Sequence, residues 1–437
     1  MKKLLSVVAM SLSASLFAAM PEVTSVTVDS RSARRVTVNY VVSGSVGFVT
    51  CVFETNFVNE VEETVWVPLK AESVRTLSGD VNRMVAVGAH QFKWNARKDF
   101  PDHKFGGNSI RVKVTAFNAY DPPDYVAIDL TQPSGGIGYY SSAEEVPGGV
   151  TDDVYKTTTL LLRRIHAAGV RWRMGSPTWE GLRSDWELAH MVTLSRDYYI
   201  GVYEFTQKQY ELVAGYDGST VPNAKPSATK SRETAAKRPV TNVTFGALRG
   251  ADYGWPSSHA VDSTRCLGLL RTRTGLEFDL PTSAQWEYAC RAGEATGYYK
   301  GVEPKSSDDW QGYATNVVAD CAWTKWNTRE DPDTSSAEAH VVGQKLPNNW
   351  GLYDMSGNVA ELCLDWYSKT AQIGEFIDPV GPAEASGLSN QSDRMWRGGD
   401  YTQGNTYMRS AASYTWTTPS SGYDFVGFRV CCPAVFN

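Results

Sequence analysis

Two carboxylates that flank a glycine are the residues of this chain most suited to chemistry. Asp354 and Glu361 stand on either side of Gly357. Glycine adopts backbone conformations closed to other residues, so the two side chains can turn their oxygens toward one point. Calcium and similar hard cations take mixed sets of carboxylate and backbone carbonyl oxygens, and the segment therefore indicates a cation site. The alternative is a helix start, because Asn358 followed three residues later by Glu361 is also a capping signature.

The sequence blocks around these residues resemble those of the sulfatase-modifying-factor family, whose best-known members are the formylglycine-generating enzymes. The family's block G-L-x-D/N-M-x-G-N-V-x-E-W is matched over residues 351–361, with Leu362 in the place of the final Trp. Three further blocks of the family are matched in the right order, at residues 201–206, 238–240 and 280–289.

The resemblance implies a C-type-lectin-like fold with structural calcium. The ligands that it implies are the side chains of Asp354 and Glu361 and the backbone carbonyls of Gly357 and Val359. The family carries a second calcium site in the region of residues 293–344. The spacing there departs from the family's pattern, so no ligands of the second site are assigned.

The same resemblance implies a copper(I) site, and this chain departs from it. Formylglycine-generating enzymes place two cysteines after an R-G-G-S turn, and the paired thiolates bind copper(I) and activate oxygen. Soft thiolate ligands select copper(I). Here the turn is residues 397–399 followed by Asp400 in the Ser place, and Gln403 and Met408 take the two Cys places. Neither side chain can supply thiolate charge, so we expect no copper at this position.

Side chains that commonly bind partners crowd the stretch after this turn. We predict a ligand-binding surface made of Asp400, Tyr401, Gln403, Asn405, Tyr407, Met408, Arg409 and Trp416. Aromatic rings with adaptable polar neighbours are typical of surfaces that recognise sugars or peptides. The alternative interpretation is that several of these residues fill the core of a loop-rich domain.

The chain of 437 residues is long enough for two domains, and its hydrophobic content of 42% is enough for real cores. Its net charge is −6, so the sequence gives no excess of positive charge that would bind phosphate groups, and nucleic acid is not an expected partner. Residues 1–19 carry a charged start and an apolar stretch, which predict a secretory signal peptide. We expect an exported protein, periplasmic or extracellular, with no later membrane span. Seven cysteines are an odd number, which leaves at least one unpaired, and their pairing stays open.

The positions of turns and alternating apolar residues predict how the chain is divided. Period-two alternation over several short runs indicates an all-β sandwich of immunoglobulin or fibronectin type at residues 21–132. Residues 133–156 begin with a Gly-, Ser- and Pro-rich run and read as a linker. Residues 157–437 form the domain that resembles the family, α+β and loop-rich, with helices expected after capping boxes that begin at Thr206 and Thr282.

Two functions of different classes fit these observations. The first is a non-catalytic module that binds a protein or a glycan. The second is a formylglycine-generating-type oxidase, or another enzyme of the family, with a divergent active site. Gln403 and Met408 favour the first function, whereas only the resemblance favours the second.

Overall fold

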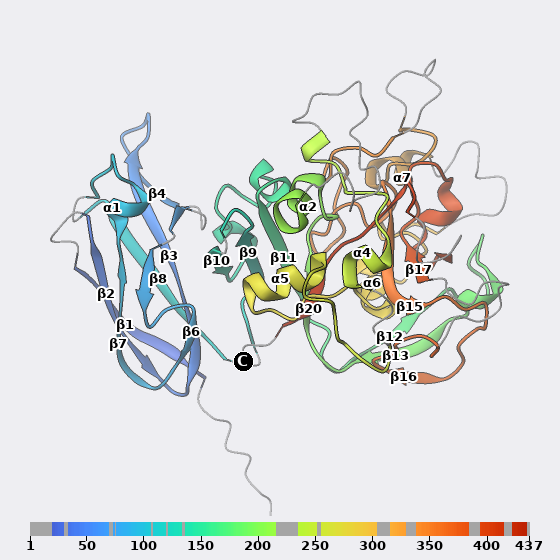
Figure 1. The fold of residues 1–437 in the computed structure, drawn as a ribbon, viewed down its shortest axis with the longest axis horizontal. Coiled ribbons are helices and arrows are strands. Elements are labelled where there is room, and N and C mark those ends of the chain that lie inside the picture. Colours follow the sequence, from blue (N-terminus) through green and yellow to red (C-terminus); the bar gives the residue numbers. More distant parts are fainter. Residues whose placement is uncertain are drawn as a thin grey trace, which may run out of the picture.

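The structure is a computed structural model of the chain. It describes residues 20–29, 34–69, 73–74, 76–105, 108–118, 121–132, 136–215, 235–250, 255–303, 315–328, 338–383, 394–414 and 422–434. The expected signal peptide at residues 1–19 and the predicted surface residue Trp416 lie outside the described residues. Figure 1 shows an N-terminal part built from strands beside a larger part that mixes strands, short helices and loops.

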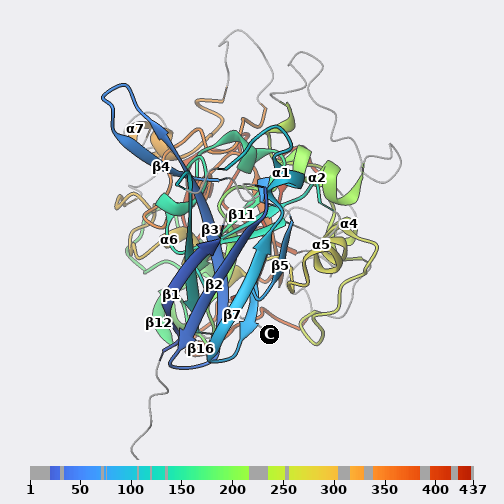
Figure 2. The ribbon, with the colours of Figure 1, turned by 90° about the vertical axis from the view of Figure 1, so that its left-hand side faces the viewer.

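The N-terminal part consists of two sheets that enclose one hydrophobic core. The first sheet has the order β1 (Glu22–Asp29), β2 (Val36–Ser43), β7 (Gly88–Trp94) and β5 (Leu77–Gly79), and it faces the viewer in Figure 2. The second sheet has the order β4 (Thr64–Pro68), β3 (Gly47–Val58) and β6 (Arg83–Val85), and β8 (Ile110–Phe117) also pairs with β3. A short helix, α1 (Ala96–Asp99), follows β7.

Alternation along β2 shows how this core forms. Val36, Val38 and Tyr40 are buried, whereas the residues between them are more exposed, because successive side chains of a strand point to opposite faces. The buried set packs against Phe53 of the second sheet and Trp94 of the first. The period-two pattern expected from the sequence is therefore present. The finer assignment to an immunoglobulin- or fibronectin-like sandwich stays a prediction.

The larger part begins earlier in the chain than the sequence indicated. Its main sheet has the order β10 (Gly136–Tyr140), β9 (Tyr125–Asp129), β11 (Thr159–Ile165), β14 (Tyr198–Gly201) and β20 (Cys431–Pro433). Strand β9 falls within the range expected for the sandwich, and β10 falls within the expected linker. Both instead pair antiparallel within this sheet, β10 with β9 and β9 with β11. The pairing gives their backbone N–H and C=O groups partners, which a free linker would leave to water.

Aromatic residues join the two parts where β3 meets β10. The rings of Phe48 and Tyr139 lie edge to face with their centroids 5.1 Å apart. Val52 of β3 belongs to the same buried cluster as Tyr125 and Tyr140. The two parts therefore share apolar contacts, and burial of such surface stabilises their association.

Two smaller sheets and several α-helices also belong to the described residues of the larger part. One sheet has the order β12 (Val170–Met174), β13 (His190–Leu194) and β16 (Glu375–Ile377), and the other has β18 (Ser413–Tyr414), β17 (Arg394–Arg397), β15 (Ala360–Trp366) and β19 (Val426–Gly427). The helices among the described residues are α2 (Gln207–Ala214), α4 (Phe245–Arg249), α5 (Cys266–Thr274), α6 (Ser283–Arg291) and α7 (Thr315–Cys321). Short 3-10 turns are η2 (Ala143–Glu145), η3 (Asp153–Lys156), η4 (Asp185–Glu187) and η6 (Asn405–Met408).

Local signals in the sequence place two of these helices. The side chain of Thr206 accepts the backbone N–H of Gln209, and the side chain of Gln209 accepts the N–H of Thr206, so α2 begins with the expected capping box. Thr282 and Gln285 make the same reciprocal pair at the start of α6. Both capping predictions are confirmed. Each box satisfies two backbone donors that a helix start otherwise leaves without partners.

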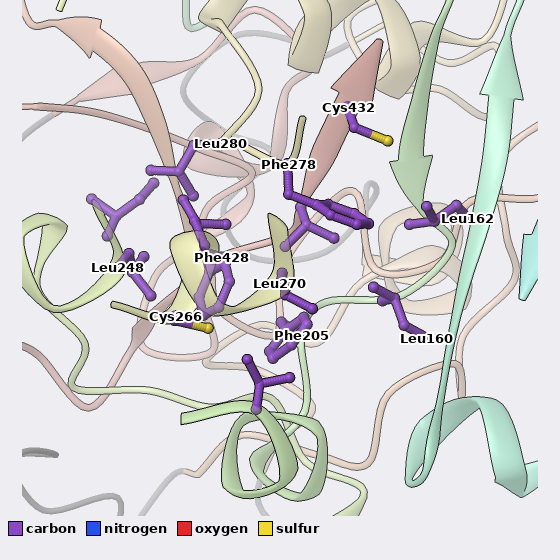
Figure 3. Packing of buried hydrophobic residues seen from close by; sticks show 14 of the residues in the cluster. Leu160, Leu162, Phe205, Leu248, Cys266, Leu270, Phe278, Leu280, Phe428 and Cys432 are labelled. Carbon is purple, nitrogen blue, oxygen red and sulfur yellow. The ribbon is translucent and has the colours of Figure 1, made fainter. Parts of the chain in front are cut away.

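One large core holds α2, α4 and α5 against the main sheet, and a second core packs α6 against β11 and β14. Figure 3 shows Leu160 and Leu162 of β11 facing side chains from α5 and from the segments around it. The rings of Phe205 and Phe428 stack in this core with their centroids 5.0 Å apart. None of the described helices is long and apolar enough to cross a membrane.

Candidate functional site

The segment that carries the predicted cation ligands forms a tight loop before β15. Asp354, Gly357 and Asn358 all have positive φ angles, of 55°, 76° and 59°. A Cβ atom at Gly357 would clash with the backbone of Trp323, which runs beside it, so the loop needs glycine at this point. The N–H of Asn358 donates to the carbonyl oxygen of Trp323 at 3.0 Å, which fixes the loop in place.

Glu361 lies in β15 and is fully buried. Its Oε2 accepts the indole N–H of Trp286 at 2.6 Å and the Nε–H of Arg429 at 2.7 Å. Its Oε1 accepts a second N–H of Arg429 at 2.6 Å. The helix-start alternative for Asn358 and Glu361 is therefore wrong, because Glu361 belongs to a strand that pairs with β17 and β19.

Asp354 is buried but only half satisfied. Its Oδ2 accepts the backbone N–H of Gly343 at 2.6 Å, whereas its Oδ1 is buried and has no hydrogen-bond partner. Burial raises the pKa of Asp354 from its ordinary value of 3.8 to about 6. A buried carboxylate oxygen without a donor is costly, and a bound cation or water is the usual explanation.

A third buried carboxylate, Glu204, stands beside this loop, and sequence reasoning missed it. Its Oε2 accepts the side-chain amide of Asn358 at 2.6 Å, and its Oε1 accepts the N–H of Val359 at 3.0 Å. Burial, and then the neighbouring charges of Asp354 and Glu361, raise the pKa of Glu204 well above its ordinary value. Glu204 belongs to the 201–206 block that carries the family resemblance, and no role was predicted for it. The available signal was a carboxylate between two aromatic residues, Tyr203 and Phe205.

Of the two predicted side-chain ligands for calcium, only Asp354 has a buried oxygen without a hydrogen-bond partner, and calcium prefers oxygen ligands. Both oxygens of Glu361 accept N–H groups of Arg429 and Trp286. Among the described residues, no three side chains of His, Cys, Asp or Glu converge tightly enough to hold a metal ion by themselves. A cation here would therefore need backbone carbonyls as well, and those of Gly357 and Val359 remain the predicted ones.

The turn after β17 is held by buried charges. The guanidinium of Arg397 donates to Oε2 of Glu287 at 3.0 Å and to the hydroxyl of Ser283 at 2.6 Å. Gly399 has a φ of 72°, and a Cβ there would lie 2.8 Å from the sulfur of Met408. The turn thus brings the backbone of Gly399 into direct contact with the residue in the second Cys place.

Asp400 follows this turn and is buried. Its Oδ1 accepts the backbone N–H and the hydroxyl of Thr402, at 2.8 and 2.5 Å, while its Oδ2 has no partner. Burial raises the pKa of Asp400 from 3.8 to about 6. The carboxyl therefore resists ionisation more than an exposed aspartate does.

The two positions that replace the cysteines have different surroundings. Met408 is fully buried and packs with Tyr298, Val318 and Ala322. Gln403 is half-buried, and its Oε1 is enclosed without a hydrogen-bond partner. Met408 therefore serves as core, and it cannot face a substrate in this arrangement.

The predicted ligand-binding surface is wrong for most of its members. The buried members are Asp400, Tyr401, Asn405, Met408 and Arg409. Arg409 donates to buried Glu180 at 3.0 Å and to Glu187 at 2.8 Å, which ties the stretch to a distant loop. These residues fill the core of a loop-rich domain, as the alternative interpretation stated. Tyr407 is 40% exposed and Gln403 is half-buried, so these two remain available to a ligand.

Comparison with known proteins settles the family of this domain. Residues 166–433 match the sulfatase-modifying factor enzyme 1-like domain. The chain belongs to this family. The resemblance read from the sequence blocks is therefore confirmed.

Proteins with different names are similar to this chain. The chain is 33% identical over 159 residues to the formylglycine-generating enzyme of Streptomyces coelicolor, a match that covers 34% of this chain and 45% of the enzyme. It is 29% identical over 222 residues to chaperone protein LppX of Paenibacillus barcinonensis, covering 45% of this chain and 74% of that protein. Treponema denticola variable protein 1 superimposes with a TM-score of 0.45 and 23% identity, covering 63% of this chain and 95% of the other. The chain thus spans less than half the length of the formylglycine-generating enzyme.

The thiols of this family member are poorly suited to metal or redox chemistry. None of the seven cysteines forms a disulfide bond in this structure. Burial raises the pKa of Cys290 to about 12 and that of Cys321 to about 11, and burial raises the pKa of the other five thiols as well. The thiolate is the form that binds metals and attacks substrates, and burial disfavours that form at these seven positions.

Three exposed aromatic residues belong to this stretch or to segments bonded to it. The N–H of Lys325 donates to the carbonyl oxygen of Gln403 at 3.1 Å, and a Cβ atom at Gly404 would lie 3.7 Å from the indole nitrogen of Trp326. Trp326 is 46% exposed, and the ammonium of Lys325 lies 4.4 Å from its ring centroid. Trp179, which is 64% exposed, precedes the Glu180 that binds Arg409.

Proposed function

We propose that this chain is an exported, non-catalytic member of the family that binds a protein or a glycan. The N-terminal part would be an immunoglobulin- or fibronectin-like sandwich that carries the binding domain. One observation supports the proposal most strongly: the second Cys place holds Met408, whose side chain is fully buried among apolar residues. A relative named as a chaperone protein also fits a role in binding.

The chemistry of the catalytic stretch argues against an oxidase. Copper(I) is held in formylglycine-generating enzymes by two thiolates, and soft anionic sulfur is what selects it. Gln403 offers a hard neutral donor, and Met408 offers a neutral thioether that faces the core. The buried thiols elsewhere cannot replace the pair, since burial keeps them protonated.

An activity assay tests this part of the proposal. The full chain, supplied with copper(I), is incubated with a cysteine-containing sulfatase-type peptide, and the peptide mass is followed. The formylglycine-generating enzyme of Streptomyces coelicolor serves as the positive control. We expect no conversion of the peptide thiol to an aldehyde. A mass loss of that kind, catalysed by the unmodified chain, would return it to the oxidases.

The binding surface that we propose is the exposed aromatic set Trp179, Trp326 and Tyr407. Aromatic side chains supply large contact areas with few rotamers to fix, and they dominate recognition surfaces. Gln403 lies at the edge of this set and adds an amide. Such a surface can stack on sugar rings or on apolar side chains of a protein.

Binding is tested with the purified chain on a glycan array and on an array of peptides. Trp326→Ala and Tyr407→Ala should each lower the signal of any bound probe at least tenfold. Phe57→Ala is the matched control, because Phe57 is an exposed aromatic on strand β3 of the other part. Equal loss in all three variants, or loss in none, would place the binding surface elsewhere.

A further inference from the structure

A cleft opens beside the turn between β13 and β14, with a volume of about 530 Å³. Its walls come from residues 194–198, from residues 378–380 after β16, from the start of α6 and from β20. Strands β13 and β16 pair side by side, which brings the first two walls together (Figure 1). Cavities of this size hold small molecules in many proteins. None of the aromatic set Trp179, Trp326 and Tyr407 lines the cleft, so it is a separate place on the molecule.

The floor of the cleft presents mostly carbon to a ligand. Three buried leucines line it, Leu194, Leu280 and Leu364. Two buried aromatic residues line it as well, and their polar atoms are already used. The hydroxyl of Tyr198 donates to a backbone carbonyl of α6 at 2.6 Å, and the indole N–H of Trp255 donates to a carbonyl after β16 at 3.3 Å. The ring of His259 packs edge to face on Trp255, with the centroids 4.8 Å apart. An apolar group placed on this floor would lose contact with water, which favours binding.

Most of the charged side chains around the cleft already have a partner of opposite charge. The guanidinium of Arg271 lies 2.6 Å from the carboxylate of Glu277. Two less exposed acids are matched in the same way, Asp197 by Arg164 at 2.6 Å and Asp279 by Arg249 at 2.7 Å. These pairs leave little net charge to act on a ligand.

Two side chains of opposite charge at the mouth of the cleft are not paired in this way. Among the described residues, neither Arg196 nor Asp378 forms an ion pair, and both are exposed. The backbone holds Asp378 in place, because its N–H donates to the carbonyl oxygen of Thr193 at 2.9 Å and its Oδ1 accepts the N–H of Ser195 at 2.8 Å. The acid is therefore fixed to the residue that precedes Arg196. One positive and one negative group thus flank the same opening.

We propose that this cleft binds a small zwitterion with an apolar body, of the kind that an apolar α-amino acid presents. Arg196 takes the carboxylate of the ligand, Asp378 takes the ammonium, and the leucine floor takes the apolar side chain. Hydrogen bonds between opposite charges are strong and directional, so the two groups set the orientation of the ligand. A ligand with a carboxylate alone would meet Asp378 without a compensating charge. This site goes beyond the proposed binding of a protein or glycan and does not depend on it.

Ligand-observed NMR titrations of the full chain with four related probes test the two charges separately. L-Phenylalanine carries both charges, hydrocinnamate lacks the ammonium, phenethylamine lacks the carboxylate, and phenethyl alcohol lacks both. We expect L-phenylalanine to bind most tightly. Each singly charged probe should bind about tenfold more weakly, because a hydrogen bond between charged groups contributes roughly that factor.

Arg196→Gln and Asp378→Asn assign each charge of the ligand to a residue. In Arg196→Gln, L-phenylalanine should bind as phenethylamine does, within about twofold, and should keep its advantage over hydrocinnamate. Asp378→Asn should show the reverse, with L-phenylalanine and hydrocinnamate alike. Both positions are exposed, so neither change disturbs a core. Asparagine tolerates the φ of 46° at position 378, and its oxygen can still accept the N–H of Ser195.

Arg97→Gln is the matched control, because Arg97 is an exposed arginine on α1 of the N-terminal part. It should keep the affinities for all four probes within about twofold of wild type. Hydrocinnamate or phenethylamine bound as tightly as L-phenylalanine would overturn the zwitterion. Unchanged affinity for L-phenylalanine in both cleft variants would overturn the roles of Arg196 and Asp378. A wild-type chain that does not bind L-phenylalanine at the solubility limit of the probe would overturn the site as a whole.

Discussion

Ionisation of Asp400 should make the larger part of the chain less stable as the pH rises, and Asp400→Asn should remove that effect. Its carboxyl is buried, with Oδ1 bonded to Thr402 and Oδ2 without a partner. Burial raises the pKa of Asp400 from 3.8 to about 6 in the folded state. The folded state therefore binds more protons than the unfolded state between these two values, and stability falls as the pH rises through them.

The size of the effect follows from the two pKa values. The full shift corresponds to roughly 3 kcal/mol, since each pKa unit is about 1.36 kcal/mol. Part of this free energy is already lost at pH 4.5, because that pH lies above the pKa of the carboxyl in the unfolded state. About 2 kcal/mol of stability is therefore lost between pH 4.5 and pH 7.5. Asp400→Asn removes the titrating group and keeps an oxygen that can accept both bonds from Thr402. The free energy of unfolding of Asp400→Asn, relative to wild type, should therefore rise by about 2 kcal/mol between these pH values.

Urea denaturation at the two pH values, followed by tryptophan fluorescence, measures this difference. Asp185→Asn is the control, because the side chain of Asp185 is 99% exposed, and its profile should run parallel to that of wild type. Asp365 is also buried with a raised pKa of about 6, so Asp400→Asn keeps the part of the pH dependence that comes from Asp365, and only the difference from wild type reports on Asp400. Parallel profiles for wild type and Asp400→Asn would show that Asp400 ionises freely and would refute the reasoning.

Three further predictions concern the cation site, the cysteine places and the core. A chelator should lower the melting temperature of wild type, and it should leave that of Asp354→Asn unchanged. The substitution removes the charge of a predicted ligand, while the amide oxygen can still accept the N–H of Gly343. An equal shift of the melting temperature in both proteins would contradict this prediction. Gln403→Cys with Met408→Cys should bind copper(I), seen by metal analysis, yet lose about 1 to 3 kcal/mol of stability, because the buried Met408 side chain is shortened. Phe428→Ala should cost about 3 to 5 kcal/mol in denaturant unfolding, since it removes the ring that stacks on Phe205, and a loss below 1 kcal/mol would show that this core is loose.

Features set by neighbouring residues could be predicted from the sequence. The capping boxes at Thr206 and Thr282 involve residues three apart, so spacing alone reveals them. The same spacing misled for Asn358 and Glu361. There the outcome depends on β17, a strand more than thirty residues away that pairs with β15, and local spacing carries no information about such a partner.

Features set by distant residues could not be predicted. Strand β9 falls inside the range expected for the sandwich, but its partner β11 lies beyond the expected linker, and local sequence does not reveal such a pairing. The residue type alone predicts that Arg409 lies at the surface, because arginines are rarely buried without partners. Its partners are Glu180 and Glu187, 229 and 222 positions earlier in the chain. Only the fold shows that they meet.

Buried arginine–glutamate pairs explain how this family member can change its catalytic stretch and keep its fold. Arg397 binds Glu287, Arg409 binds Glu180 and Glu187, and Arg429 binds Glu361. Each pair joins segments far apart in sequence. A buried pair adds little net stability, but removing one partner leaves an uncompensated charge and costs about 3 to 5 kcal/mol. These pairs therefore restrict where the loops can lie.

Gln403 and Met408 take part in none of these ion pairs. They lie between Arg397 and Arg409, which hold the two ends of the stretch at Glu287 and at the Glu180 loop. Replacing the cysteines consequently alters the chemistry of the stretch while its ends stay fixed. Met408 then fills the core beside Tyr298, and Tyr407 next to it keeps its exposure. The frame that would hold a copper site in a relative here holds Gln403 and the buried Met408, which is the physical basis for proposing a binding function for this family member.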